Sequence, residues 1–210
     1  MISSFSQIYD ISMTIEPGMQ VYKNKEEKKP ELINMANFSN AKVHETRVAM
    51  DVHCGTHLDA ALHMIEGGET IEAIPLEELI GIARVVDLTH VKEAIEREHL
   101  ESLDLQKGEW VVFKTRNSLS EEFDFDFVYL ADSGAQYCIE RGVQGVGTDG
   151  LGIERAQPEY PTHRSLLRNR VHIVEGLRLK DVPAGTYTLV VAPLKLTGID
   201  AAPARAFLMK

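Results

Sequence analysis

One short segment constrains this chain more than any other, because it gathers ligand-type side chains around a place where the backbone must bend. Residues 52–64 read VHCGTHLDAALHM and place three histidines and one aspartate within eleven positions. In a fully extended segment the Cα atoms of His53 and His57 would lie about 13 Å apart, at ~3.3 Å per residue. Gly55 lies between them and permits a sharp turn. A bend at Gly55 or a helical turn is therefore expected to bring His53, His57 and Asp59 together.

The side chains of this segment suit a divalent cation. Neutral imidazole and carboxylate are ligands that a borderline divalent ion prefers, and no Lys or Arg interrupts them here. An ion bound inside a domain needs three or four protein ligands, so further donors must come from elsewhere. His163 opens an expected short helix and Glu175 ends an apolar run, which makes these two the best additional candidates. The remaining histidines are expected to be surface or locally satisfied residues: His44, His90, His99 and His172.

His63 is close to these ligands in sequence but is surplus to their coordination. Such an imidazole suits a general base that takes a proton from water and returns it to a leaving group. Two other roles stay open for His63, those of a fourth metal ligand and of a partner that orients Asp59. An alternative to a metal-dependent enzyme is a cysteine hydrolase, in which Cys54 would pair with His57. Because free cysteines are usually buried and inert, Cys54 is instead expected to be a small packed residue.

Composition limits the size of the protein and its partners. The chain has 210 residues, of which 44% are hydrophobic and 26% charged, and this suits one globular domain over residues 1–210. The formal net charge of -10 argues against nucleic acid, because phosphate binding needs clustered Lys and Arg. The mixed-sign run KNKEEKK at residues 23–29 is expected to be a solvated loop. A small-molecule substrate is therefore the expected partner.

The cellular location is also predicted from the sequence. No segment approaches the ~20 apolar residues of a membrane span, and the amino-terminal residues lack the pattern of a secretory signal. The chain has only two cysteines, Cys54 and Cys138, which suits a reducing compartment. A cytoplasmic protein without membrane contact is expected.

Apolar periodicity predicts a mixture of strands and helices, and hence an α/β fold with a mixed sheet and flanking helices. Residues 41–53 alternate and are expected to form a strand with one mostly apolar face, ending at His53. Further strands are expected at residues 82–88, 109–115, 143–149, 171–175 and 185–196, the last broken by Pro193. Helices are expected at residues 75–81, 90–103 with a cap at Thr89, 134–142 with a stop at Gly142, and 162–169.

Two blocks of sequence resemble the bacterial kynurenine formamidase family, also called the metal-dependent cyclase family. They are HCGTHLDAALH, which begins at His53, and HRSLLRNRVHIVEGL, which begins at His163. Weaker likeness extends through GVQGVGTDGLGIE and the carboxy-terminal tail, so the resemblance covers most of the chain from about Val43 onward. It implies a swivelling β/β/α fold, a homodimer or higher homo-oligomer, and metal-dependent hydrolysis of an amide or cyclic amide. The implied substrate is a small aromatic metabolite such as N-formylkynurenine, in tryptophan catabolism.

The resemblance also implies a ligand set. Carried over position by position, His53, His57, Asp59 and Glu175 would hold one divalent ion. His163 would hold a second ion that shares Asp59 and Glu175. One or two ions are therefore expected, most simply Zn²⁺, with Mn²⁺ as the alternative, since both accept mixed nitrogen and oxygen ligation.

The same resemblance implies that His63 is the proton donor and acceptor. This sequence departs from the family pattern at residues of the expected pocket wall. Ala61 replaces a family proline, and Met64 replaces an aromatic residue. Residues 21–29, VYKNKEEKK, stand where relatives have an aromatic-Pro-Gly-Asp stretch. The expected metal-ligand positions match the family pattern, whereas residues of the expected pocket wall differ from it. Two alternatives are a hydrolase of isatin-like cyclic amides or lactones, and a non-catalytic member that binds metal or ligand without turnover.

Overall fold

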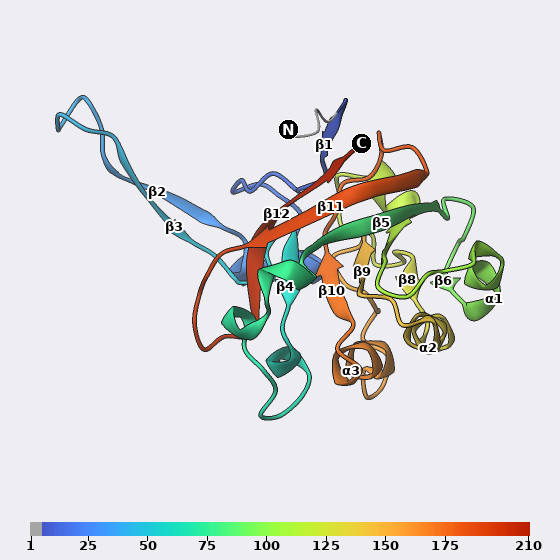
Figure 1. The fold of residues 1–210 in the computed structure, drawn as a ribbon. Helices are drawn as coiled ribbons and strands as arrows, with labels where there is room; N and C mark the ends of the chain where they lie inside the picture. The colour runs from blue at the N-terminus through green and yellow to red at the C-terminus, as the bar shows by residue number, and fades with distance from the viewer. Residues whose placement is uncertain (1–5) are drawn as a thin grey trace, which may run out of the picture.

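The computed structural model describes residues 6–210, and its centre is a mixed sheet of eight strands (Figure 1). The strands are β1 (Ile8–Asp10), β4 (His57–Asp59), β5 (Ile80–Asp87), β7 (Trp110–Lys114), β9 (Gly145–Thr148), β10 (His172–Glu175), β11 (Gly185–Pro193) and β12 (Ala201–Met209). Their order is β1-β12-β11-β5-β7-β9-β10-β4, and β12 also pairs with β4. The sheet therefore closes on itself like a barrel. The predicted α/β class with a mixed sheet is confirmed.

Three helices cover the sheet on the side of its parallel strands (Figure 1). They are α1 (Arg97–Leu100), α2 (Asp132–Arg141) and α3 (Pro161–Arg168). Strands β5, β7, β9 and β10 run parallel, whereas β11, β12 and β4 close the sheet with antiparallel pairs. Short 3-10 turns lie at Tyr22–Asn24, Glu26–Lys28, Ala61–His63, Ile71–Ala73, Leu76–Glu78, Glu101–Leu103 and Arg116–Leu119. No helix within residues 6–210 is both long and apolar enough to cross a membrane.

Strands β7, β9 and β10 are buried along almost their whole length, whereas the first three residues of β5 are partly or fully exposed. In β7, Val111 and Phe113 pack in the core beneath the helices, whereas Trp110 and Val112 pack in the core inside the closed sheet. All four are fully buried. Successive side chains of a strand point to opposite faces, so one strand serves two cores. This double burial explains the apolar centres of the strands predicted at residues 109–115 and 171–175.

Gly145 in β9 is needed because the indole ring of Trp110 occupies the space beside it. A Cβ atom built on Gly145 would lie 2.4 Å from a Trp110 ring carbon. We expect Gly145→Ala to lower the free energy of unfolding by roughly 1–3 kcal/mol through overpacking. Gly18→Ala is the matched control, since a Cβ there meets nothing within 4 Å. Denaturant titration measures both, and equal stabilities of the two variants would contradict this packing.

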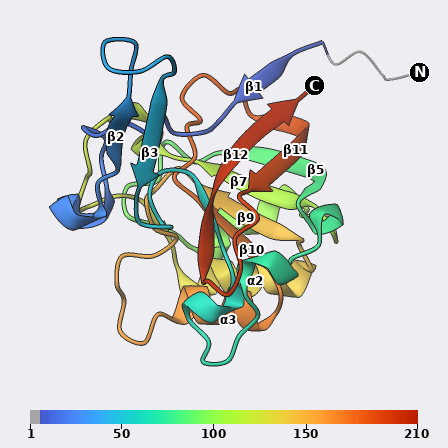
Figure 2. The ribbon, with the colours of Figure 1, turned by 90° about the vertical axis from the view of Figure 1, so that its left-hand side faces the viewer.

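A two-stranded arm, β2 (Glu31–Ala36) and β3 (Glu45–Ala49), projects from the body of the protein (Figures 1 and 2). The prediction of a strand over residues 41–53 is wrong in two respects. All of β3 is exposed, so its apolar face covers no core within the described chain. The strand also ends before His53, which lies in the following turn, where its backbone N–H donates to Asp51 Oδ1 at 2.9 Å.

The helix predicted over residues 90–103 is largely replaced by other structure. Residues Ala94–Ile95 form β6, which pairs with β8 (Tyr129–Leu130), so tertiary pairing overrides local helix propensity. Helix α1 begins only after Glu96, which forms a capping box with His99, and Thr89 is not its cap. The helix predicted at residues 75–81 is a single 3-10 turn. The strands predicted at 82–88 and 185–196 and the helices at 134–142 and 162–169 are confirmed, with small shifts of their ends.

Candidate metal centre

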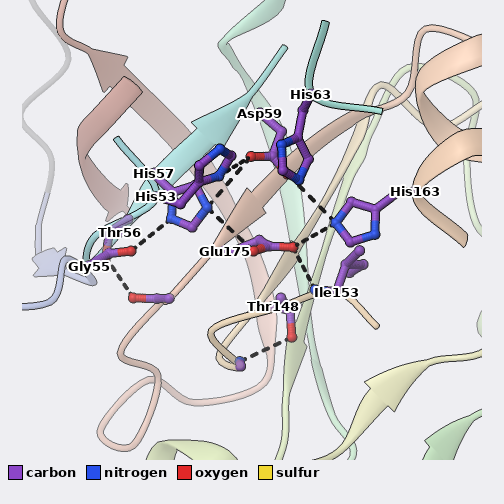
Figure 3. A network of polar contacts seen from close by, with 12 residues as sticks. His53, Gly55, Thr56, His57, Asp59, His63, Thr148, Ile153, His163 and Glu175 are labelled. Atoms are coloured by element: carbon purple, nitrogen blue, oxygen red, sulfur yellow. Dashed lines mark hydrogen bonds and ion pairs between the residues drawn. The ribbon is translucent and has the colours of Figure 1, made fainter. Parts of the chain in front are cut away.

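Strand β4 brings the first group of predicted ligands against β10. In the antiparallel pairing of these strands, His57 lies directly opposite Glu175. Gly55 has φ +70°, which confirms the expected bend before the strand. Because of this bend, His53 folds back so that its imidazole also reaches Asp59 (Figure 3).

Two glycines permit the close approach of the two ligand segments. Gly176 follows Glu175 with φ +70°, and a Cβ atom there would lie 2.6 Å from the carbonyl oxygen of Gly55. The hydroxyl of Thr56 donates to the carbonyl oxygen of Gly176 at 2.6 Å, and it accepts from the backbone N–H of Met13 at 2.8 Å. The turn before β4 and the turn after β10 are thereby fastened together, which fixes the separation of their side chains.

Three imidazoles are oriented by acceptors on the outer side of the site. His57 Nδ1 donates to the carbonyl oxygen of Gly55 at 2.9 Å. His163 Nδ1 donates to Glu154 Oε1 at 2.6 Å, and His53 Nε2 donates to Asp200 Oδ2 at 2.8 Å. A ring nitrogen that donates outward leaves the other nitrogen to face inward as a lone-pair donor, which is how metal-binding histidines are commonly held.

The inward nitrogens converge on two buried carboxylates (Figure 3). His53 Nδ1 lies 3.2 Å from Asp59 Oδ1, His57 Nε2 lies 3.3 Å from Glu175 Oε2, and His163 Nε2 lies 3.3 Å from Glu175 Oε1. Asp59 is only 1% exposed, yet neither of its oxygens accepts a hydrogen bond within the described chain, and His57 Nε2 has no hydrogen-bond partner there either. Buried polar atoms rarely stay unpaired, so this arrangement calls for an additional partner.

The electrostatics of the site favour positive charge between the carboxylates. Burial by itself lowers the pKa of His163, but the carboxylates of Glu154 and Glu175 outweigh it and raise this pKa to about 10. Burial also opposes the charge of His53, yet the Asp59 carboxylate raises its pKa to about 9. Protons on these imidazoles balance the carboxylates. A divalent cation at the same place would compete with those protons.

The residues present fit a divalent cation. Ligand atoms of His53, His57 and Asp59 lie within 4.8 Å of one another, and so do those of Asp59, His63 and His163. Asp59 belongs to both groups, and its two oxygens have no hydrogen-bond donors within residues 6–210. Imidazole and carboxylate are the ligand types expected for such an ion. The predicted ligand residues are thus brought together from two distant parts of the sequence.

His63 lies beside the two buried carboxylates but is more accessible than they are. It ends the 3-10 turn Ala61–His63 that follows β4, and its side chain is 22% exposed. Its ring centroid lies 4.2 Å from that of His53 and 5.6 Å from that of His163. Burial lowers the pKa of His63, and the neighbouring imidazoles add to this effect. An accessible imidazole that favours its neutral form at neutral pH can accept a proton.

Two acidic residues of the site were not found from the sequence. Asp200 precedes β12 and lies 2.8 Å from His53 Nε2 and 3.5 Å from His63 Nδ1. Glu154 is buried, and besides His163 Nδ1 it accepts the backbone N–H groups of Thr162 and His163. Each is an isolated acid without a motif of its own, so only its place in the fold reveals it.

The four histidines expected to be unrelated to the site are indeed elsewhere. His172 Nε2 contacts Glu78 Oε2 at 2.8 Å, and none of the four belongs to a potential metal-binding group within residues 6–210. These histidines are His44, His90, His99 and His172.

Cys54 is a packed residue, as predicted. It is 1% exposed, its Sγ lies 3.5 Å from Met19 Sδ, and burial raises the pKa of its thiol to about 11. We expect Cys54→Ala to retain at least about half of the wild-type kcat, because a buried, protonated thiol is a poor nucleophile. Steady-state kinetics of this variant, with alkylation of the wild-type protein alongside, tests the cysteine-hydrolase alternative. Loss of activity in both experiments would favour that alternative.

Comparisons with known proteins show which family this chain is similar to. The model of the Cyclase family matches residues 9–155. The kynurenine formamidase of Salinibacter ruber is 33% identical over 204 residues, which are 96% of this chain and 96% of that protein. Cyclase-like protein 3 of Arabidopsis thaliana is 35% identical over 219 residues, covering 97% of this chain and 80% of the relative.

Solved structures extend the likeness to the fold. A protein of Bacillus stearothermophilus, described as a "predicted metal-dependent hydrolase", is 51% identical with a TM-score of 0.89, over 97% of this chain and 98% of the other. Isatin hydrolase A of Labrenzia aggregata shares the fold at 22% identity, with a TM-score of 0.86 over 97% of this chain and 93% of that one. The fold and site define an α/β protein with a closed sheet and a buried histidine–carboxylate cluster. The chain belongs to the cyclase family.

Proposed function

We propose that this protein is a metal-dependent hydrolase that cleaves an amide bond, either a formamide or a cyclic amide, of a small aromatic metabolite. One observation carries the proposal. Three imidazoles donate outward to Gly55, Glu154 and Asp200 while their inner nitrogens face the carboxylates of Asp59 and Glu175. Related proteins named kynurenine formamidase support the reaction class.

The proposed metal ligands are the five residues that converge at the centre of the site. A divalent cation bound there would supply Lewis acidity, which lets water ionise near neutral pH and polarises a carbonyl group. The ligands are His53, His57, Asp59, His163 and Glu175. Zn²⁺ is the proposed ion, because mixed imidazole and carboxylate ligation suits it, and one or two ions fit the two groups that share Asp59.

The proposed proton carrier is His63. Asp200 Oδ2 lies 3.5 Å from His63 Nδ1, and this contact favours a proton on that nitrogen. Nε2 is then free to accept a proton from the attacking water and to return it to the leaving nitrogen. The buried neighbours hold that imidazole beside the site, while its partial exposure lets it reach a substrate.

The cavity above the site suits a small aromatic compound. It has a volume of about 300 Å³, which is at the lower end of the range for ligand pockets. Tyr22 and Tyr160 contribute aromatic side chains to its wall, and Met64 and Leu151 contribute apolar ones. These side chains would surround a planar ring whose amide group points to the imidazoles.

Two measurements on the purified protein test the proposal. Elemental analysis is expected to find one or two zinc ions per chain, and a chelator is expected to abolish turnover that added Zn²⁺ restores. Hydrolysis is then assayed on formamides, cyclic imides, lactones and isatin-like compounds. Turnover that survives complete removal of metal would refute the mechanism. A metallated protein that binds one of these compounds tightly but hydrolyses none would instead be a non-catalytic binding member of the family.

We also propose that residues 1–210 form one catalytic domain in the cytoplasm. Strands from both ends of the described chain enter the same sheet, since β12 pairs with β1, β4 and β11. Both cysteines are free and buried, which suits a reducing compartment. Limited proteolysis that releases no stable fragment would agree with a single domain, and cell fractionation tests the location.

We propose in addition that the protein is a homodimer that buries the β2–β3 arm. An isolated two-stranded ribbon is only marginally stable in water, so an ordered arm needs a packing partner. The arm exposes large apolar side chains, including Met35 (48%) and Phe38 (78%). At its base lies a groove of about 610 Å³, lined by Ile15, Leu32, Val48, Met50, Ala192 and Leu194. In a two-fold dimer, the arm of each copy would fill the groove of the other.

Size-exclusion chromatography with light scattering tests the dimer. We expect Phe38→Glu to weaken dimerisation about 100-fold or more, because it would bury an unpaired charge in an apolar interface. Leu119→Glu is the control, since Leu119 is also exposed (60%) but lies outside the arm. A wild-type protein that is monomeric at every concentration would overturn this proposal.

A further inference from the structure

The cavity above the site has a basic side. Three lysines line it together with residues of the candidate metal centre: Lys23, Lys25 and Lys28. They come from the 3-10 turns Tyr22–Asn24 and Glu26–Lys28 and the residue between them. The same cavity is also lined by imidazoles and by the buried carboxylates of Glu154 and Glu175. The imidazole and carboxylate side of the cavity, here called the floor, suits a cation. The side with Lys23, Lys25 and Lys28, here called the rim, carries positive charge.

Folding separates the charges of this loop, which the sequence presents as mixed. Glu26 and Glu27 do not line the cavity, and their side chains are 82% and 72% exposed. Lys29 turns away from the cavity and pairs with Glu26 at 2.7 Å. Lys23 and Lys25 are exposed, as predicted for a solvated loop, and together with Lys28 they also border the cavity. A rim with this charge is notable on a chain whose formal net charge is -10.

Lys28 is already neutralised and fixes the loop to the site. Its Nζ lies 3.0 Å from Asp51 Oδ2, and Asp51 Oδ1 accepts the backbone N–H of His53. Through this chain of contacts the loop is held against the residue that begins the metal-binding segment. Lys28 is thus a structural anchor rather than a free cation.

Lys23 and Lys25 have no comparable partners. The ammonium group of Lys23 lies 5.2 Å from the centroid of the Tyr22 ring, and no carboxylate lies within 4.0 Å of it in the described part of the chain. Lys25 has Glu27 at 3.9 Å, and both of those side chains are at least half exposed, so that contact is weak. Neither ammonium group is neutralised by a close, buried carboxylate in the described part of the chain.

The backbone of the loop is held in an unfavourable conformation to present these side chains. Lys23 has φ 58° and Asn24 has φ 51°, in the left-handed region where non-glycine residues pay roughly 1–2 kcal/mol. Asn tolerates this conformation, but Lys has no local hydrogen bond to compensate. Strained residues of this kind cluster at ligand-binding sites, because surrounding contacts hold them there.

We propose that Lys23 and Lys25 bind a carboxylate of the substrate, so that the enzyme acts on aromatic amides that carry an acid group on the ring or close to it. The inference rests on the proposed function, which places the amide group at the imidazoles. The lysine rim is the reason for expecting an acid group on the same substrate. A substrate of this kind spans the divided cavity, with its amide at the imidazole floor and its carboxylate at the lysine rim. The aromatic side chains of Tyr22 and Tyr160 flank the ring between them.

Binding of a matched pair of ring compounds to the zinc-loaded protein tests this inference without requiring turnover. Calorimetry is used with 2-aminobenzoate and the neutral 2-aminobenzamide. We expect the anion to bind about tenfold more tightly to the wild type, and the preference to fall below about twofold in Lys23→Gln/Lys25→Gln, the effect of two partly screened charge contacts. High salt is expected to reduce the wild-type preference. Zinc content is measured in every sample.

The matched control is Lys29→Gln/Lys92→Gln, which removes the same charge from lysines that do not line the cavity. This control is expected to keep the full preference. A preference that persists in Lys23→Gln/Lys25→Gln would place the carboxylate on the metal and overturn the inference, as would the absence of a preference in the wild type.

Kinetics with the N-formyl derivatives of the same two compounds separates this inference from the proposed function. If the wild type binds the anion through the lysines but hydrolyses neither these derivatives nor any compound of the amide panel, the proposed function fails while carboxylate binding by the lysines stands. If both derivatives are hydrolysed with equal kcat/KM and the anion shows no preferential binding, the proposed function stands and the inference fails.

Discussion

Replacing Asp59 with asparagine is expected to lower the bound metal at least tenfold and the rate at least about 10³-fold. Asp59 is fully buried, and both of its oxygens lack hydrogen-bond donors in the described chain. It belongs to the group of potential ligands that contains His57 and also to the group that contains His163. Asparagine has nearly the same shape but no charge and only one oxygen. Elemental analysis and steady-state kinetics measure the two effects.

Asp87→Asn provides the control for this experiment. Asp87 ends β5 on the surface, where it accepts hydrogen bonds from Thr89, and it lies outside the potential metal-binding groups. This variant is expected to keep its metal and its activity. Circular dichroism of both variants separates loss of metal from loss of fold. A folded Asp59→Asn protein that keeps full metal and full activity would exclude the proposed centre.

Replacing His63 with alanine is expected to lower kcat by about 10² to 10⁴-fold while leaving the metal content unchanged. The reason is that His63 is partly exposed, its Nδ1 faces Asp200, and its proposed role is to carry a proton rather than to bind the ion. The expected signature is a loss in kcat larger than any change in KM. Added imidazole is expected to restore part of the rate, because it can carry the same proton.

His90→Ala is the matched control, because His90 is exposed and belongs to no potential metal-binding group within residues 6–210. It is expected to behave as wild type. The ligand atoms of His63, Asp59 and His163 also lie within 4.8 Å of one another. If His63 were a metal ligand, its replacement would lower the metal content. Loss of metal in His63→Ala would assign His63 as a ligand, and an unchanged rate would remove it from the mechanism.

The sequence predicted those parts of the fold in which local pattern and burial agree. The runs at residues 109–115 and 171–175 have apolar centres, at residues 110–113 and 173–174, because both faces of these strands are covered. Helix α2 ends at Gly142, whose φ of 69° is the left-handed cap that glycine supplies. The secondary-structure prediction failed where pairing with a distant segment determines the conformation. Ala94–Ile95, for example, pairs with β8 instead of joining a helix.

By itself the sequence determined the ligand types of the candidate site, since the spacing from His53 to His63 and the bend at Gly55 are local properties. Only the tertiary structure decided that β4 pairs with β10, which sets His57 opposite Glu175, and that Asp200 and Glu154 support the imidazoles from outside. It also decided which charges of residues 23–29 face the cavity. The physical reason is that hydrogen bonding between strands and the burial of charge depend on groups far away in the chain, which no local pattern encodes.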